Sequence, residues 1–190
     1  MLAAIAVLAL LLPAAIARVV SQARVDRARA ETRVIAAAIS QFRADTGFYP
    51  LWSRARDGGP GTEADRVQLL VGEGNIPLPD GPKQWPSAAG LDRLDHQLIT
   101  NAPGYRRATS GTSGWNGPYL ASDVGPDPWG NRYMVNVGLV SGDATTGPQP
   151  APPLAVWVIS AGPDGKIETP YRQAAVTATL SGDDVGARVR

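Results

Sequence analysis

The sequence predicts an α+β fold in which one long N-terminal helix, part membrane anchor and part amphipathic stem, packs on a small antiparallel β-sheet domain. Residues 1–46 contain no glycine and a single proline, whereas the rest of the chain is rich in both. The longest runs of β-branched and aromatic residues lie after residue 132. Because 190 residues are enough for one compact core plus an appendage, we expect a helix followed by a single loop-rich domain.

Residues 1–20 are expected to be the transmembrane part of the helix. The first 17 residues carry no charge, and Val19 and Val20 extend the apolar stretch if Arg18 extends its side chain to the membrane surface. A stretch of this length just spans about 30 Å of hydrocarbon. A cleaved secretory signal is the alternative, since Ala15 and Ala17 are small residues of the kind a signal peptidase accepts, but no basic segment precedes the apolar run and the helical pattern continues beyond it.

Residues 21–46 are expected to form an amphipathic stem that continues the anchor. They contain no glycine or proline, and apolar or small residues recur at steps of three and four, which places them on one face of a helix. That stripe consists of Val25, Ala28, Thr32, Ile35, Ile39 and Phe42. Gly47 stands where a left-handed cap would end the helix. A continuous helix of about 46 residues is roughly 70 Å long, so part of it must project from the domain.

Residues 47–190 are expected to form the globular domain. From Leu51 to Ser113 we expect mostly loops with two short helices. The predicted helices cover Glu63–Val71 and Ala88–Thr100. Three antiparallel strands should follow, and residues 141–153 should be an exposed hairpin loop between the first two. The predicted strands cover Tyr133–Val140, Leu154–Ser160 and Ala175–Leu180.

The composition indicates no active site, and we expect that the protein is not an enzyme. Cysteine is absent, which excludes disulfides, thiolate metal ligands and a cysteine nucleophile. The single histidine, His96, lies in a charged stretch without a nucleophile at a known spacing, so a solvated helix residue is the favoured interpretation. A formal net charge of +1 with interspersed signs argues against nucleic acid as a partner. Arg106 and Arg107 would suit an anion, although an exposed loop pair is the simpler interpretation.

Carboxylates near the C-terminus form the best candidate metal site. Asp164 lies in SAGPDGK, and Asp183 and Asp184 lie in SGDDV, so glycine-flanked turns carry all three. Ca²⁺ takes six to eight oxygen ligands from carboxylates and carbonyls, which irregular turns can supply. The alternative is that both segments are ordinary turns without an ion, because Pro-Asp-Gly and Gly-Asp-Asp are common turn sequences.

Several sequence blocks occur in a characteristic order. They are ADTGFYP at 44–50, GWNGPYL at 114–120, DPWGNRY at 127–133, SAGPDGK at 160–166 and GDDV at 182–185. DPWGNRY is the most specific block: Asp127 starts a turn, Trp129 is expected to be a buried anchor, and Tyr133 begins a strand. In this order the blocks resemble the major pseudopilin of bacterial type II secretion systems, within the type IV pilin-like superfamily.

The resemblance implies a pilin-like fold and a structural role. The stems would assemble with copies of the same chain into a filament that drives proteins across the outer membrane. The protein would be single-pass in the inner membrane with its globular domain in the periplasm, and its partners would be minor pseudopilins and the inner-membrane assembly platform. The resemblance also implies a bound Ca²⁺, with Asp164, Asp183, Asp184 and a carbonyl of Ala161 as ligands.

The family's leader, its cleavage glycine and the phenylalanine and glutamate of its apolar run do not occur in this sequence. Alignment of Pro13 with the family's helix proline predicts that the natural protein starts further upstream. Two alternatives to the pseudopilin remain. One is a type IV pilus or competence-type pilin, which usually carries a C-terminal disulfide. The other is a membrane-anchored periplasmic binding domain that does not polymerise.

Overall fold

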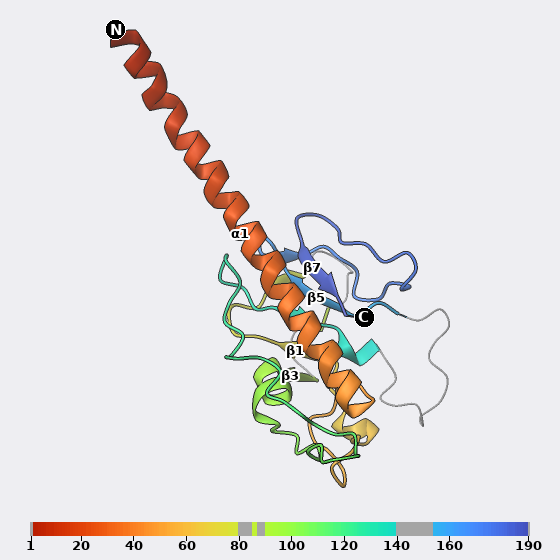
Figure 1. Ribbon diagram of the computed structural model, residues 1–190. Helices are drawn as coiled ribbons and strands as arrows, with labels where there is room; N and C mark the ends of the chain where they lie inside the picture. The colour runs from red at the N-terminus through yellow and green to blue at the C-terminus, as the bar shows by residue number, and fades with distance from the viewer. Residues whose placement is uncertain (1, 80–84, 87–89, 140–153, 190) are drawn as a thin grey trace.

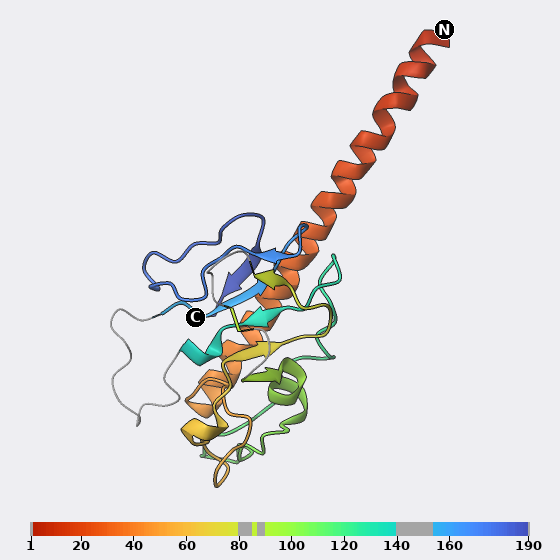
Figure 2. The same cartoon turned by 180° about the vertical axis from the view of Figure 1, so that it is seen from behind.

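The chain has a pilin-like α+β architecture, with a long N-terminal helix packed on a five-stranded, mostly antiparallel sheet (Figure 1). The computed structural model describes residues 2–79, 85–86, 90–139 and 154–189, of which residues 2–14 and 79 are described by backbone alone. Helix α1 (Leu2–Thr46) continues unbroken through Pro13. Its C-terminal half lies against the domain, and its N-terminal half projects well beyond it, as both views show (Figure 2).

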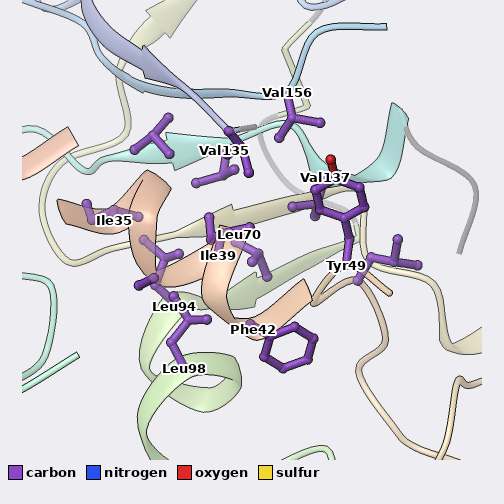
Figure 3. Packing of buried hydrophobic residues seen from close by; sticks show 14 of the residues in the cluster. Ile35, Ile39, Phe42, Tyr49, Leu70, Leu94, Leu98, Val135, Val137 and Val156 are labelled. Atoms are coloured by element: carbon purple, nitrogen blue, oxygen red, sulfur yellow. The ribbon is translucent and has the colours of Figure 1, made fainter. Parts of the chain in front are cut away.

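The predicted stripe forms the buried face of α1. Val25 is half-buried, and the other five members are buried. Phe42 and Ile39 are fully buried within the main core, where Figure 3 shows them facing Leu94, Leu98 and Leu70. The helix ends as predicted, since Gly47 has a φ of 85° and its N–H donates to the carbonyl of Arg43. A side chain at this φ would be strained, so glycine ends the helix at little cost.

The main sheet has the strand order β3-β1-β4-β5-β7. Its strands are β1 (Leu69–Val71), β3 (Leu91–Arg93), β4 (Met134–Val135), β5 (Trp157–Ser160) and β7 (Val185–Arg188). The β1–β3 pair is parallel, and the other three pairs are antiparallel. In the centre, Met134 pairs with Ile159. Helix α1 packs mainly on β5 and β7, so the C-terminal strands hold the stem.

Shorter elements complete the domain. A second, two-stranded parallel sheet joins two turns that lie far apart in sequence. The strands of this second sheet are β2 (Leu78–Pro79) and β6 (Lys166–Ile167). The other short elements are the 3₁₀ helices η1 (Glu63–Asp65) and η4 (Val137–Leu139), and the π-helix η3 (His96–Thr100). Because β2 pairs with β6, the turn that precedes β6 is fixed against the segment around residue 78.

Several predicted elements differ from the structure. In the helix predicted over Glu63–Val71 only the 3₁₀ helix η1 is helical, and the apolar end of the segment is instead strand β1, whose three residues are all buried. In Ala88–Thr100 only the C-terminal part is helical, and β3 precedes it. The strand predicted over Ala175–Leu180 is wrong, because residues 175–177 form a turn, residues 178–180 form no regular element, and the strand that pairs with β5 is β7, further along the chain. The loop predicted over 141–153 lies outside the described residues.

Within the described part of the chain, we find no helix that combines the length and the apolar character needed to cross a membrane.

Candidate functional site

The projecting part of α1 carries apolar side chains that the rest of the chain does not cover. All side chains from Ala15 to Arg24 are exposed. Ile16, Val19 and Val20 are 59%, 69% and 46% exposed. Arg18 lies among these residues, and Arg24 ends the exposed stretch. Exposed apolar residues that gather on one surface mark a contact site, because isolated ones are common but clusters are not.

A groove lies beside the packed half of α1. It encloses about 310 Å³ between the helix and residues 120–126. Its lining is mostly apolar and includes Ala30, Val34, Leu120, Val124 and Pro126. Val34 points away from the core and is 59% exposed. Glu31, Asp123 and Arg27 add charged side chains to the lining, and because Arg27 pairs with Glu31, Asp123 gives the groove its negative charge.

A polar contact ties the stem to the sheet at this groove. The Tyr133 hydroxyl donates to Glu31 Oε2 over 2.5 Å, and Arg27 pairs with the other Glu31 oxygen at 2.8 Å. Burial, followed by the Glu31 contact, raises the pKa of Tyr133 well above its usual value. Tyr133 is therefore a neutral hydrogen-bond donor over the physiological pH range and holds the start of β4 against α1.

The two turns that carry the predicted metal ligands meet in space. Gly162, with a φ of 66°, lies so close to Asp183 that an added Cβ would be 2.4 Å from the Asp183 carbonyl oxygen. Asp164 is exposed and accepts the N–H of Lys166, whereas Ala161 is fully buried at the end of β5. The structure thus brings together the segments SAGPDGK and SGDDV, although 14 residues of chain lie between them.

Asp164, Asp183 and Asp184 form an acidic cluster, in which Asp184 is the buried member. It is 8% exposed, and its Oδ2 accepts the backbone N–H groups of Glu168 and Thr169 at 3.0 and 2.6 Å. Its Oδ1 is buried and has no hydrogen-bond partner among the described residues. Burial raises the pKa of Asp184 to about 6, although the hydrogen bonds from Thr169 and Glu168 oppose this shift.

Glu168 is a fourth carboxylate that the sequence did not indicate. Its Oε2 accepts the N–H of Asp183 at 2.8 Å, and the side chain lies against Gly182. Desolvation and the nearby Asp164 and Glu168 carboxylates raise the pKa of Asp183. No repeat or turn pattern links Glu168 to Asp183, because residues 169–182 separate them.

The described residues contain no group of three or more histidine, cysteine, aspartate or glutamate side chains placed to hold a metal ion. A Ca²⁺ ion at the acidic cluster would therefore need backbone carbonyls for part of its ligand shell, which is usual for this ion. The orphaned Asp184 oxygen and the repulsion around Asp183 fit a cation at this place.

The DPWGNRY block is organised by a buried aspartate. Asp127 Oδ1 accepts the N–H groups of Trp129 and Asn131, both at 2.9 Å, and Oδ2 accepts the Ser160 hydroxyl at 2.6 Å. Trp129 is only partly buried, so its predicted role as a buried anchor is wrong. Asp127 instead joins the turn before β4 to the end of β5, next to the acidic cluster.

His96 belongs to a structural network. Its side chain is 44% exposed, and Nδ1 lies 2.8 Å from Oδ1 of Asp92. The other Asp92 oxygen accepts from Gln97 Nε2 at 2.6 Å, and Gln97 also donates to the Trp52 carbonyl at 2.9 Å. Gln97 is fully buried, so the Asp92 carboxylate positions core residues as well as His96.

No protein-family profile, no curated protein and no solved structure matches the chain. The surfaces described above, together with the sequence blocks, therefore carry the functional inference.

Proposed function

We propose that this protein is the structural subunit of a type II secretion pseudopilus. It assembles through its N-terminal helix into a helical filament that drives protein export across the outer membrane. The globular domain stands in the periplasm, and the apolar start of the helix lies in the inner membrane. Minor pseudopilins and the inner-membrane assembly platform are the expected partners.

The observation that supports this proposal is that one chain carries two apolar surfaces that the rest of the described chain leaves uncovered. One is the exposed stretch around Val19 on the projecting helix, and the other is the groove beside Val34. Arg18 within the first surface and Arg24 at its end complement Asp123 at the second, where Glu31 is already paired with Arg27. When two different surfaces of one chain bind each other, the contact is head-to-tail, and it gives a filament when the rotation between subunits does not close into a ring.

Disulfide cross-linking tests this contact, and the natural absence of cysteine makes the experiment clean. Val19→Cys and Val34→Cys are introduced together into the full chain in cell membranes. Fifteen residues of helix separate the two positions by about 22 Å, so they cannot pair within one molecule. Mild oxidation is expected to give a ladder of covalent oligomers.

Each single variant is expected to give no ladder, because a head-to-tail contact does not place a residue opposite itself. Val19→Cys with Val176→Cys is the matched control, since Val176 is 82% exposed but does not line the groove. A ladder of equal intensity in this control, or none in the test pair, would contradict the docking. A chain that stays monomeric under all conditions would favour the non-polymerising binding domain.

Calcium is the second part of the proposal, and the orphaned Oδ1 of Asp184 supports it. Asp164, Asp183 and Asp184 would hold the ion with a carbonyl of Ala161, and Glu168 lies close enough to Asp183 to add negative charge. The ion would supply positive charge that joins the two turns and removes the repulsion between their carboxylates.

Thermal melts with calcium or with a chelator test the site. The wild-type protein is expected to melt at a clearly higher temperature with calcium, and Asp164→Ala should lose most of that difference. Lys166→Ala is the control, because it removes the neighbouring side chain without removing a carboxylate. Superimposable melts of the wild-type protein with and without calcium would rule out the site.

A further inference from the structure

A small cavity lies beside the C-terminal end of α1. Figure 1 shows that this end of α1 lies on the side of the domain away from the projecting part of the helix. The cavity encloses about 190 Å³. Three segments that are distant in sequence build it. They are the end of α1 with Thr46 and Phe48, the turn at Gly58–Pro60, and the two runs Tyr105–Arg106 and Ser113–Trp115. It is separate from the groove and from the acidic cluster.

Backbone hydrogen bonds fix these walls. The N–H of Arg106 donates to the Gly58 carbonyl at 2.6 Å, and the N–H of Trp115 donates to the Arg106 carbonyl at 2.8 Å. Gly114 donates to the carbonyl of Asp45 at 2.8 Å, which connects the wall to the last turn of α1. The cavity is therefore formed before any ligand arrives, and preorganisation lowers the cost of binding.

Aromatic rings form its apolar lining. Tyr105 and Trp115 are 3% and 2% exposed, and Phe48 contacts Tyr105 with ring centroids 5.4 Å apart. The polar atoms of both buried rings are engaged elsewhere. Tyr105 donates its hydroxyl to Gln97 and Trp115 donates its indole N–H to the Gln97 carbonyl. These two rings therefore support the wall from behind, and the partly exposed Phe48 ring is the aromatic surface that a ligand can reach.

Two cationic side chains stand at the same place. Arg106 lines the cavity and is exposed, and its guanidinium has no partner among the described residues. The guanidinium of Arg107 lies over the Trp115 ring, 4.8 Å from its centroid, and likewise forms no ion pair within the described chain. The hydroxyl of Thr46 is already bonded to the Phe42 and Phe48 carbonyls, so charge attraction must come from the arginines.

We propose that this cavity binds a small organic carboxylate, with its apolar body against the Phe48 ring and its carboxylate at Arg106. The guanidinium fork matches a carboxylate with two parallel hydrogen bonds. The cavity is smaller than the ~300–1,000 Å³ typical of drug-sized ligands, so it takes a compact acid or the last residue of a polypeptide. This site does not depend on filament formation.

Titration of the full chain in detergent micelles tests the proposal, with the amide resonances of Arg106 and Gly114 and the indole N–H of Trp115 as reporters. Phenylacetate is the probe, and phenylacetamide is its neutral counterpart. Phenylacetate is expected to bind at least about tenfold more tightly, because a charged hydrogen bond to Arg106 is lost in the amide. Equal binding of acid and amide would overturn the proposal.

Arg106→Gln is expected to weaken phenylacetate binding about tenfold. Arg54→Gln is the matched control, since Arg54 is an exposed arginine that does not line the cavity, and it should leave binding unchanged. Equal losses in both variants would indicate unspecific charge attraction and refute the site. An unchanged affinity in Arg106→Gln would refute it as well.

A third experiment distinguishes a free small acid from a polypeptide C-terminus as the source of the carboxylate. The tripeptide Gly-Gly-Phe is compared with its C-terminally amidated form. Tighter binding of the free peptide than of phenylacetate would identify a polypeptide C-terminus as the ligand. Binding of phenylacetate alone would identify a free small acid. If neither binds, no carboxylate site exists here.

Discussion

Replacement of Asp127 should reveal how much the DPWGNRY block contributes to the stability of the domain. Asp127→Ala removes the acceptor of three hydrogen bonds at once, from Trp129, Asn131 and Ser160. A hydrogen bond to a charged group contributes about 1.5–3 kcal/mol, and the two part-buried amides regain some of this from water. We therefore expect the free energy of unfolding to fall by about 3–5 kcal/mol.

Asp127→Asn is the matched control. Its amide oxygen still accepts from Trp129 and Asn131, and its amide nitrogen can donate to Ser160 Oγ, so the expected loss is about 1 kcal/mol. Urea unfolding followed by tryptophan fluorescence measures the difference. With a slope of about 2 kcal/mol per M, Asp127→Ala should unfold about 2 M earlier than wild type. If the two variants unfold within 0.5 M of each other, roughly 1 kcal/mol on this slope, the hydrogen-bond account is wrong.

Three further predictions use the same stability assay. Phe42→Ala should lower the free energy of unfolding by about 3–5 kcal/mol, because Phe42 is fully buried against Phe48 and Tyr105. Val34→Ala, on the exposed groove side of α1, should lower it by less than about 0.5 kcal/mol. Similar losses in the two variants would contradict the assignment of the buried and exposed faces. Gly47→Ala should lower the free energy of unfolding by about 1 kcal/mol. Only the positive φ contributes to this loss, because an added Cβ meets no atom within 4 Å. A loss above about 3 kcal/mol would indicate a contact that the structure lacks. In chelator, wild-type protein should become more stable from pH 7 to pH 4, because Asp184 has a folded pKa of about 6 and binds its proton before the unfolded chain does. Asp184→Asn should flatten that gain, and an unchanged pH profile in this variant would place the titration elsewhere.

The helix and its buried face follow from local pattern. Steps of three and four placed Ala28, Ile35 and Ile39 on one stripe, and Gly47 marked the end, because helical hydrogen bonds and capping depend on residues within about five positions. Strands β4 and β5 also lie within predicted runs, where β-branched residues fill buried positions on a sheet.

The sequence does not predict the other strands of the main sheet, because they form only where they can pair with a neighbouring strand. β1, β3 and β7 are three or four residues long, too short for a period to emerge, and β7 contains a glycine. Each forms where a neighbouring strand offers unpaired backbone groups, which is a long-range condition. Trp129 was misjudged for a similar reason, since the burial of a side chain depends on what packs over it.

The candidate sites divide in the same way. The long helix, its stripe and cap, and the two turns with Asp164, Asp183 and Asp184 can be predicted from the sequence, because each depends on neighbouring residues. Three other features can be seen only in the folded chain: Glu168 joins these carboxylates, Val34 borders a groove, and Arg106 lines a cavity. Those features arise between segments far apart in the chain, and their positions are set by packing rather than by any local pattern.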